Sequence, residues 1–295
     1  MEKVLTVVVP SYNAEKYLQE DIPYFLDEEI LNDVEILIIN DGSRDGTQKV
    51  GEGFQNGYPD SVRVIKKENG GHGSAVNTGI LEAKGRYLKI VDADDWVDTT
   101  NFKKLVHVLK TESNDLILHP FYYVNDDTGE REDGLPMKKE QWETITYGRP
   151  YELEEVLEQI KDDLLMHEIT YRTSLLREHS IKLDENHFYV DQEYVLYPIP
   201  FIKTVVFYPE YVYQYRIATL GQSMNWNNLI KNRDMHGEVL LNVIQYYEAL
   251  KGSLTNNQKE FFVYRCAKML NTQASIYLMM KECGQAKKEI RQFEE

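Results

Sequence analysis

Residues 87–96 of the chain are YLKIVDADDW, an apolar run that ends in three carboxylates within four positions. The run Tyr87–Val91 has the length and apolar character of a buried strand. Carboxylates this close together repel one another unless solvent or a cation lies between them. Asp92 and Asp94 alternate onto one side of an extended chain, where such oxygen ligands suit Mg²⁺ or Mn²⁺. Metal binding is therefore the preferred interpretation, and a solvated acidic loop that caps the next helix is the alternative.

Similar strand-like runs lie on both sides of this one, each next to a turn and an amphipathic stretch. This alternation is typical of βα units in a parallel sheet, and the unbroken hydrophobicity of the runs predicts a sheet covered on both faces. Helices are expected between the strands, with N-caps at Asn13, at Ser43 or Asp45, and at Thr99 or Thr100. The expected strands are Val4–Val9, Val34–Ile39, Val62–Lys66, Tyr87–Val91 and Leu116–His119.

The pattern changes near residue 120. The polar, turn-rich residues 125–139 are interpreted as an excursion, and a helix is expected over Glu152–Lys161. A strand is expected at Thr204–Tyr208, with Tyr211–Tyr215 as its partner. Beyond residue 225, two long helices over 229–250 and 255–281 predict a hairpin whose apolar face docks on the rest of the chain. Recruitment of a partner protein or of a membrane by that face is the alternative.

Composition limits the function classes. The 295 residues include 49 acidic and 33 basic ones, for a net charge of -16, which argues against binding nucleic acid. An acidic protein can hold an anionic nucleotide when a divalent cation lies between the carboxylates and the phosphates. Cys266 and Cys283 outline neither a disulfide framework nor a zinc site. The run Val4–Val9 is too short for a signal peptide, so a cytoplasmic protein is expected, either free or peripheral at the inner face of the cell membrane.

Three further segments lie where a predicted strand ends and a helix begins, at the sheet edge where open α/β folds bind ligands. Pro10-Ser11-Tyr12-Asn13 offers amides and an aromatic face to a planar base, although an ordinary turn explains it equally well. Asp41 could accept a hydrogen bond from an imide such as uracil N3, with a helix cap as the alternative. The glycine-rich run 69–79, NGGHGSAVNTG, permits close backbone approach to a phosphate or sugar. Its His72 is interpreted as a loop or packing residue.

Taken together, these four segments, in this order and spacing, resemble the family-2 glycosyltransferases, which have the GT-A nucleotide-binding fold. The resemblance covers about the first 120 residues. It implies that Asp41 contacts uracil, that Asp92 lies near the ribose or the metal, and that Asp94 is the best metal ligand. The family often has arginine where this chain has Val76. The donor-binding residues implied are Pro10, Ser11, Tyr12, Asn13, Asp41, Asn69, Gly71, Ala75, Asn77, Asp92, Ala93, Asp94 and Arg216.

The second half resembles the family more weakly. Residues 187–194, HFYVDQEY, are similar to the family's Glu-Asp-x-x-aromatic segment, so the resemblance implies Asp191 as the catalytic base. Val190 stands where the family has glutamate, and an N-cap for a helix over 192–199 is the alternative role of Asp191. Residues 213–216, YQYR, and 221–224, GQSM, are similar to family segments that could close over the diphosphate, with strand packing as the equal alternative for the tyrosines.

The resulting expectation is a GT-A fold with a mostly parallel central sheet, flanked by helices, and a C-terminal helical extension. Residues 1–224 would form the catalytic domain, with halves 1–120 and 121–224, and residues 225–295 a helical hairpin and tail. The expected activity is inverting, Mn²⁺- or Mg²⁺-dependent transfer from a UDP-sugar to a hydroxyl of a glycan, lipid-linked oligosaccharide or glycoprotein. The alternatives are a non-catalytic relative acting through a partner protein, and a dinucleotide oxidoreductase, which would lack the Asp-x-Asp.

Overall fold

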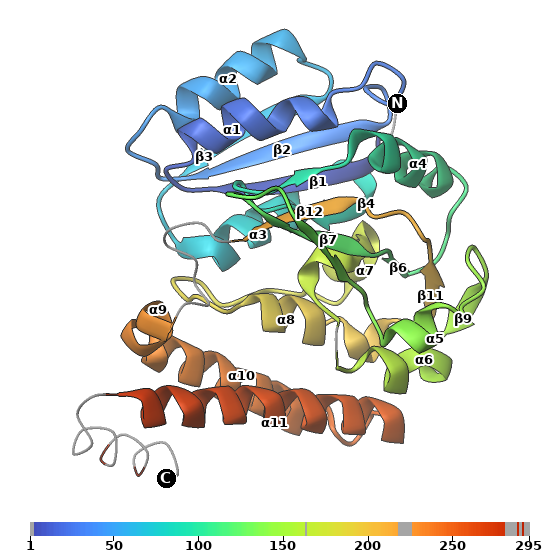
Figure 1. The fold of residues 1–295 in the computed structure, drawn as a ribbon, viewed down its shortest axis with the longest axis vertical. Coiled ribbons are helices and arrows are strands. Elements are labelled where there is room, and N and C mark those ends of the chain that lie inside the picture. Colours follow the sequence, from blue (N-terminus) through green and yellow to red (C-terminus); the bar gives the residue numbers. More distant parts are fainter. Residues whose placement is uncertain (1–2, 163, 218–225, 281–287, 289–290, 292–295) are drawn as a thin grey trace.

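The computed structural model describes residues 3–162, 164–217, 226–280, 288 and 291. Its centre is an eight-stranded sheet in the order β3-β2-β1-β4-β10-β6-β11-β9 (Figure 1). Neighbours pair in parallel except where β10 and β9 run against the others. The mostly parallel α/β sheet is therefore confirmed. Its strands are β1 Lys3–Ser11, β2 Val34–Asp41, β3 Val62–Lys67, β4 Gly85–Ile90, β6 Leu116–Leu118, β9 Pro150–Glu152, β10 Ile169–Arg172 and β11 Thr204–Phe207.

Helices cover both faces of this sheet, as the unbroken apolar strands predicted. In β1, Val7 and Val9 face one core and Val8 faces the other, because successive side chains point to opposite sides. The first core is covered by α1 (Glu15–Asp21), η1 (Ile22–Phe25), α2 (Thr47–Gly57) and α4 (Thr99–Leu109), and the second by α3 (Gly71–Glu82), α7 (Thr173–Glu178) and α8 (Asp191–Leu196).

A second sheet has the order β5-β12-β7-β8, with β5 Trp96–Val97, β12 Tyr213–Ile217, β7 Phe121–Asn125 and β8 Arg131–Gly134. The expected excursion at 125–139 is thus partly a β-hairpin, β7-β8, in this sheet. The pairing of Tyr211–Tyr215 with Thr204–Tyr208 was wrong. Both edges of β11 are taken by β6 and β9, so β12 pairs with β5 and β7 instead.

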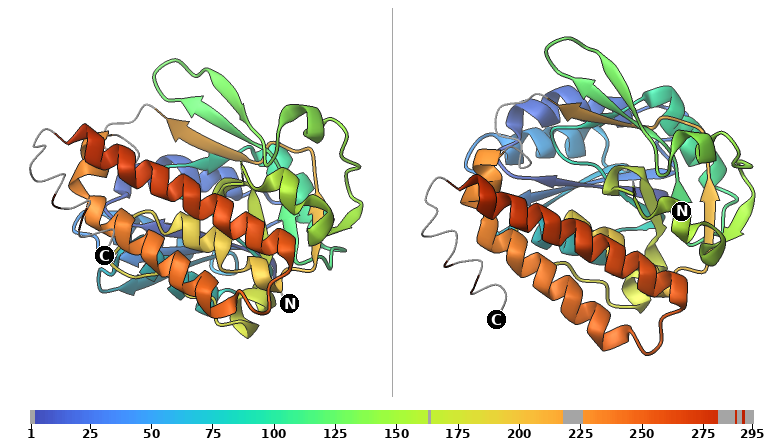
Figure 2. Two further views of the ribbon diagram at one scale, coloured as in Figure 1. Left: turned by 90° about the horizontal axis from the view of Figure 1, so that it is seen from below. Right: turned by 60° about the horizontal axis from the view of Figure 1, so that its bottom comes forward.

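The C-terminal helices are α9 (Trp226–Lys231), α10 (Arg233–Leu250) and α11 (Asn256–Met279). The single helix expected over 229–250 is divided at Asn232, whose backbone leaves the helical region. Helices α10 and α11 lie side by side, and Figure 2 shows the pair along one end of the molecule. None of the described helices combines the length and hydropathy needed to cross a membrane.

The hairpin docks on the body of the protein, as its apolar face predicted. Phe261, Phe262, Met269, Ile276 and Tyr277 are buried, whereas Leu270 of the expected face is half exposed. Buried Arg265 donates hydrogen bonds to the carbonyl of Leu164 at 3.0 Å and to Gln192 Oε1 at 2.8 Å. These charge-assisted bonds tie α11 to α8 and to the residues just before η2.

Helix starts differ from the expected caps. Ala14 and Gly46 occupy the N-cap positions of α1 and α2, and Asp98, one residue before Thr99, caps α4 by accepting from the Asn101 amide at 2.9 Å.

The remaining helices are α5 Lys139–Trp142, α6 Leu153–Ile160, η2 Met166–Glu168 and η3 Ile199–Phe201. The 221–224 segment and the domain boundary after residue 224 lie outside the described residues.

Candidate active site

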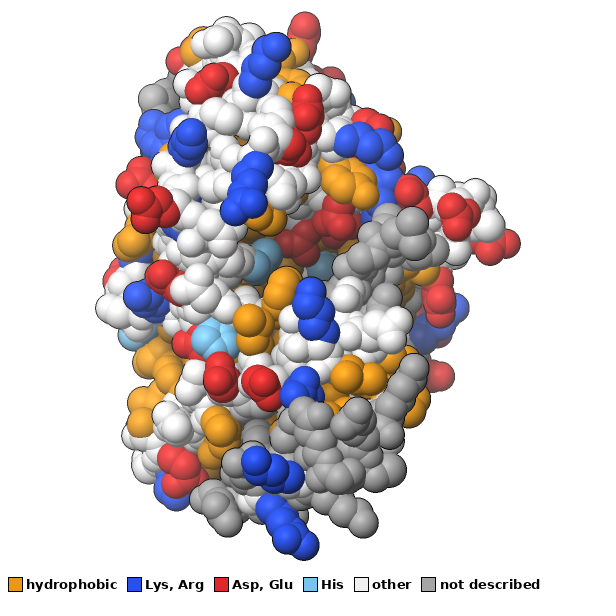
Figure 3. Space-filling model, turned by 90° about the vertical axis from the view of Figure 1, so that its left-hand side faces the viewer, with side chains coloured by type: hydrophobic (Ala, Val, Ile, Leu, Met, Phe, Trp, Pro, Cys, Tyr) orange, Lys and Arg blue, Asp and Glu red, His pale blue; other side chains and the backbone are white. Residues whose placement is uncertain are grey.

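A cleft of about 510 Å³ opens at the carboxyl ends of β1 and β4. Figure 3 shows a hollow in which acidic side chains gather, with histidines beside them. Segments far apart in the sequence meet here: the β1–α1 turn, the loop after β4, η2, the start of α8, and β12. The lining residues are Pro10, Tyr12, Asn13, Ala14, Tyr17, His72, Asp92, Ala93, Asp94, Leu165, Met166, His167, Phe188, Tyr189, Val190, Asp191 and Tyr215.

The carboxylates after β4 sit on a turn, not on the extended chain that alternation assumed. The Asp95 amide donates to the carbonyl of Asp92 at 3.0 Å, which brings these two residues together. Asp95 is buried, and its carboxylate accepts hydrogen bonds from the Tyr213 hydroxyl and, at 2.7 Å, from the Arg216 amide. Asp95 thereby fastens the acidic turn to β12.

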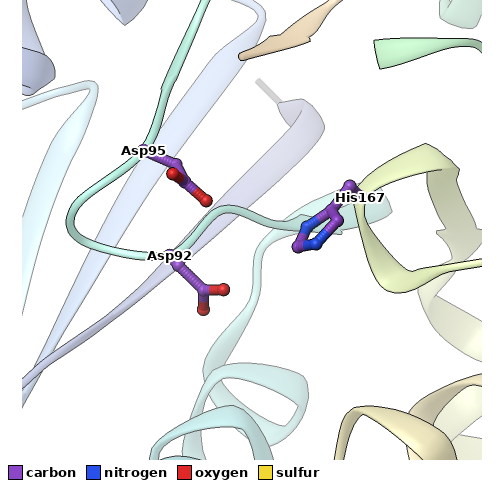
Figure 4. Close-up of side chains that lie close together, drawn as sticks. All are labelled: Asp92, Asp95 and His167. Atoms are coloured by element: carbon purple, nitrogen blue, oxygen red, sulfur yellow. The ribbon is translucent and has the colours of Figure 1, made fainter. Parts of the chain in front are cut away.

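Asp92, Asp95 and His167 form a compact group whose potential ligand atoms all lie within 4.8 Å of one another (Figure 4). The group contains Asp95 and His167 in place of the expected Asp94. Burial lowers the pKa of His167 to about 4, so its imidazole is neutral, the form that binds metals. Its Nδ1 is buried with no hydrogen-bond partner among the described residues. Oxygen and imidazole donors together suit a divalent transition metal such as Mn²⁺.

Two further groups set the charge and position of this cluster. Burial raises the pKa of the Asp94 carboxyl, and the negative charge of Asp92 raises it further, as expected for crowded carboxylates. Buried Lys89 of β4 donates from Nζ to the carbonyls of His167 at 2.7 Å and Ile169 at 3.2 Å. Lys89 therefore holds the backbone that presents His167 to the cleft.

His72, expected to be a loop or packing residue, lines the cleft and bonds from Nε2 to Asp92 Oδ1 at 2.9 Å. Burial alone would lower the pKa of His72, but the hydrogen bond and charge of Asp92 outweigh it, and the net shift is upward. The charges of Asp191 and Asp94 act in the same direction. His72 thus lies between the acidic turn and the segment that carries the expected base.

Asp41 organises the glycine-rich turn. Its carboxylate accepts hydrogen bonds from Lys67 Nζ at 2.7 Å and from the amides of Gly70 and Gly71 at 3.0 and 2.8 Å. Asn69 donates from Nδ2 to the Asp41 carbonyl at 2.9 Å. Asp41 is buried and does not line the cleft. In the structure its carboxylate acts as an anchor for the start of α3.

The glycines of this turn let another segment of the chain approach α3. A Cβ on Gly73 would lie 2.1 Å from the carbonyl oxygen of Asp184, and Gly71 has a φ of +81°. Deeper in α3, buried Asn77 donates to the Leu183 carbonyl and accepts from the Leu183 amide, both at 2.8 Å. These contacts hold residues 183–186, and with them the approach to Asp191, against α3.

Asp191 is the first residue of α8, preceded by Val190, whose side chain cannot cap the helix. The expected helix over 192–199 is shorter, and Asp191 lies inside its first turn, not at its N-cap. Tyr189, two residues earlier, has a φ of +68°, which is rare for a bulky residue; strained backbone of this kind tends to cluster at active sites. The backbone thus turns Tyr189, Val190 and Asp191 into the cleft.

The two departures from the family pattern are core residues. Val76 and Val190 are buried in the same apolar cluster, where a charged side chain would lose its hydration. Arg216, expected at the donor, is engaged by the protein: its guanidinium bonds to the Asp94 carbonyl at 2.6 Å and to the Asp21 carboxylate at 3.1 Å, and it lies over the Trp96 ring. It braces the acidic turn from outside the cleft lining.

Of the expected site residues, seven line the cleft: Pro10, Tyr12, Asn13, Asp92, Ala93, Asp94 and Asp191. The other seven do not line it: Ser11, Asp41, Ala75 and Asn77 are buried, and Asn69, Gly71 and Arg216 lie outside the lining. The sequence did not point to His167 or Lys89, and His72 was expected to be only a loop or packing residue. The position of His72 at a helix start beside the ligand-binding sheet edge was a usable signal, whereas His167 lies in no recognisable motif.

Residues 6–181 match the profile of the Glycosyl transferase family 2, so the chain belongs to this family. The uncharacterized glycosyltransferase EpsJ of Bacillus subtilis is 35% identical over 127 residues, which cover 43% of this chain and 36% of EpsJ. The chain therefore spans about a third of that relative's length.

Two solved structures share the fold. S. aureus TarS 1–349 in complex with UDP-GlcNAc has a TM-score of 0.67 at 18% identity, covering 96% of this chain and 77% of TarS 1–349. The mannosyltransferase PcManGT from Pyrobaculum calidifontis, in complex with GDP-Man and Mn²⁺, has a TM-score of 0.60 at 15% identity, covering 94% and 75%. The expected GT-A architecture is thereby confirmed.

Proposed function

We propose that the protein is a metal-dependent, inverting glycosyltransferase that moves a sugar from a UDP-sugar to an acceptor hydroxyl. The proposal rests chiefly on one observation. In a chain of this family, the acidic residues Asp92 and Asp94 and the separate carboxylate Asp191 line the same cleft. The acceptor class is a glycan, a lipid-linked oligosaccharide or a glycoprotein, which the protein would meet in the cytoplasm or at the inner face of the membrane.

The donor side is the β1–α1 turn and the acidic turn. Half-exposed Tyr12 and the neighbouring Asn13 offer an aromatic face and an amide to a nucleobase, and Asn13 has a φ of +52°. For Asp41 to accept from the uracil imide, it would have to exchange one of the hydrogen bonds that it accepts from Lys67 and from the amides of Gly70 and Gly71. The UDP-GlcNAc complex of TarS supports a UDP-sugar donor here.

Asp92, Asp95 and His167 fit a divalent cation, and Asp94, the ligand that the family resemblance implies, lines the cleft beside them. The fit rests on the unpartnered, neutral His167 Nδ1 and on carboxylates whose crowding a cation would relieve. When bound, Mn²⁺ or Mg²⁺ would offset the charge of the donor diphosphate. The Mn²⁺ complex of PcManGT supports this choice.

Asp191 takes the proton of the acceptor hydroxyl. As the hydroxyl oxygen bonds to the anomeric carbon, the bond from that carbon to the diphosphate oxygen breaks, and UDP leaves from the opposite face with inversion. Asp191 and Asp92 come from different segments, so a sugar between them could be attacked on one side while UDP departs on the other. Residues 1–224 would carry this chemistry, and the hairpin from 225 would support it.

UDP release by the purified protein from a panel of UDP-sugars, with GDP-mannose as comparator, tests the proposal. We expect release from at least one UDP-sugar in Mn²⁺, loss of release in EDTA, and recovery when Mn²⁺ is added back. UDP binding without release from any donor and acceptor extract would favour the non-catalytic alternative. Release that is insensitive to EDTA would refute the metal assignment.

A further inference from the structure

Phe188 is an aromatic residue of the cleft whose ring is open to solvent. It lines the cleft and is 48% exposed, close to the 50% of Tyr12 on the β1–α1 turn. The other tyrosines of the lining, Tyr17, Tyr189 and Tyr215, are partly buried. Figure 3 shows hydrophobic side chains beside the acidic ones at the rim of this hollow. Ligand-binding clefts use such side chains to cover the apolar parts of a ligand.

The backbone on both sides of Phe188 is fastened to α10. Before it, His187 bonds from Nε2 to Glu238 Oε2 at 2.7 Å. After it, the Tyr189 ring packs edge-on against the His236 ring, with 5.3 Å between the centroids. The Phe188 ring itself lies 6.2 Å from that of Tyr189. The exposed ring therefore has a defined position in the wall of the cleft.

Under the proposed function, Phe188 belongs to the acceptor side of the cleft. It precedes Asp191 by three residues, so their Cα atoms are at most about 11 Å apart, and both side chains line the same cleft. Tyr12, by contrast, comes from the β1–α1 turn, which the proposed function assigns to the donor. A sugar ring that lies on Phe188 can therefore bring one of its hydroxyl groups to the Asp191 carboxylate, which accepts hydrogen bonds from hydroxyl donors.

We propose that Phe188 stacks on the sugar ring whose hydroxyl is glycosylated, and that it thereby selects a pyranoside acceptor over an acyclic polyol. This inference rests on the proposed function and specifies its acceptor. A pyranose ring presents a face of C–H bonds that can lie flat on a phenyl ring, while its hydroxyl groups point outward from the rim. An open-chain polyol such as ribitol has no fixed apolar face, so it gains little from an exposed aromatic ring.

Saturation-transfer NMR with UDP and Mg²⁺ present tests this proposal. The probes are ribitol and the methyl β-pyranosides of glucose, galactose and N-acetylglucosamine. Irradiation of the protein's aromatic protons should saturate the axial C–H protons on one face of at least one pyranoside, and should saturate ribitol much less. Phe188→Leu should remove this face-specific transfer and weaken binding of that pyranoside by roughly 3–10-fold, as expected for one lost stacking contact, whereas Phe188→Tyr should keep both. Tyr58→Leu, at a tyrosine that is 38% exposed and outside the cleft lining, is the matched control and should bind as wild type does.

Kinetics with the bound pyranoside as acceptor separate stacking from a structural role. Phe188→Leu should raise the KM for the pyranoside more than it lowers kcat, and Phe188→Tyr should restore the wild-type KM. Saturation of ribitol equal to that of every pyranoside, no saturation of any pyranoside, or wild-type binding by Phe188→Leu would overturn the proposal. UDP release from UDP-sugars, measured without an acceptor, reports on the donor site. Face-specific pyranoside binding without UDP release from any donor would refute the proposed function and leave the stacking contact standing.

Discussion

Replacing Asp191 by asparagine separates chemistry from folding. Asp191 lies in the first turn of α8, is half-buried, and its Oδ2 accepts a hydrogen bond from Gln192 Nε2 at 3.1 Å. Asparagine keeps the shape of the side chain and can still accept that bond. The substitution removes a negative charge near the start of the helix, which lowers the free energy of unfolding by about 0.3–1 kcal/mol. We therefore expect Asp191→Asn to change the melting temperature little.

The effect on the reaction should be much larger. Loss of a general base costs roughly 10²–10⁴-fold in rate, or about 2.7–5.5 kcal/mol in activation free energy. The donor need not contact Asp191 before the reaction, so the affinity for UDP should stay within about twofold of wild type. Calorimetric titration of UDP in Mn²⁺ and transfer kinetics at saturating donor measure the two quantities. Glu185→Gln, an exposed carboxylate on the same segment, is the matched control.

Either of two results would refute this reasoning. Transfer by Asp191→Asn at the wild-type rate would assign the base elsewhere, with Asp184 and Glu193 as the substitutes. Glu193 is a poor substitute because it is buried, accepts hydrogen bonds from the Asp184 amide and the Tyr197 hydroxyl, and has its pKa raised to about 8 by burial. Joint loss of transfer and UDP affinity would instead place Asp191 in the donor site.

Three other substitutions test the rest of the cleft. Asp94→Ala should abolish transfer and the Mn²⁺ dependence of UDP binding. The melting temperature should not fall, because the substitution removes one of several crowded negative charges. Titration of UDP with and without EDTA measures the Mn²⁺ dependence, and retained transfer activity would contradict the prediction. Asn77→Ala should lower the free energy of unfolding by about 2–4 kcal/mol, since it leaves both buried backbone groups of Leu183 unpaired; urea unfolding measures this, and a purely donor-binding role for Asn77 would leave stability unchanged. Arg265→Met should destabilise the protein by about 2–4 kcal/mol through lost charge-assisted bonds, including that to Gln192; a wild-type urea midpoint would mean that the docking of α11 does not depend on this residue.

The strands of the first half were readable because each is a local signal. Unbroken β-branched runs such as Val34–Ile39 are predicted and observed as buried strands of a parallel sheet. The Thr255 start of α11 was also correct: its capping box with Gln258 involves residues three apart. The partners of β11 and β12 were not readable, because pairing depends on which sheet edges remain open once the chain has folded.

The sequence by itself determined the family, the α/β sheet, and the acidic and aromatic motifs at its ligand-binding edge, since these depend on residues close together in the chain. Only the tertiary structure decided what meets there. It places His72 within hydrogen-bonding distance of Asp92, and it places His167, from a segment without a motif, beside Asp92 and Asp95. A turn brings Asp92 and Asp95 together. Such contacts depend on how distant segments pack. Residues 183–186 pack against the glycines of α3, and buried Lys89 donates a hydrogen bond to the His167 carbonyl in η2. No pattern of neighbouring residues in the sequence predicts either contact.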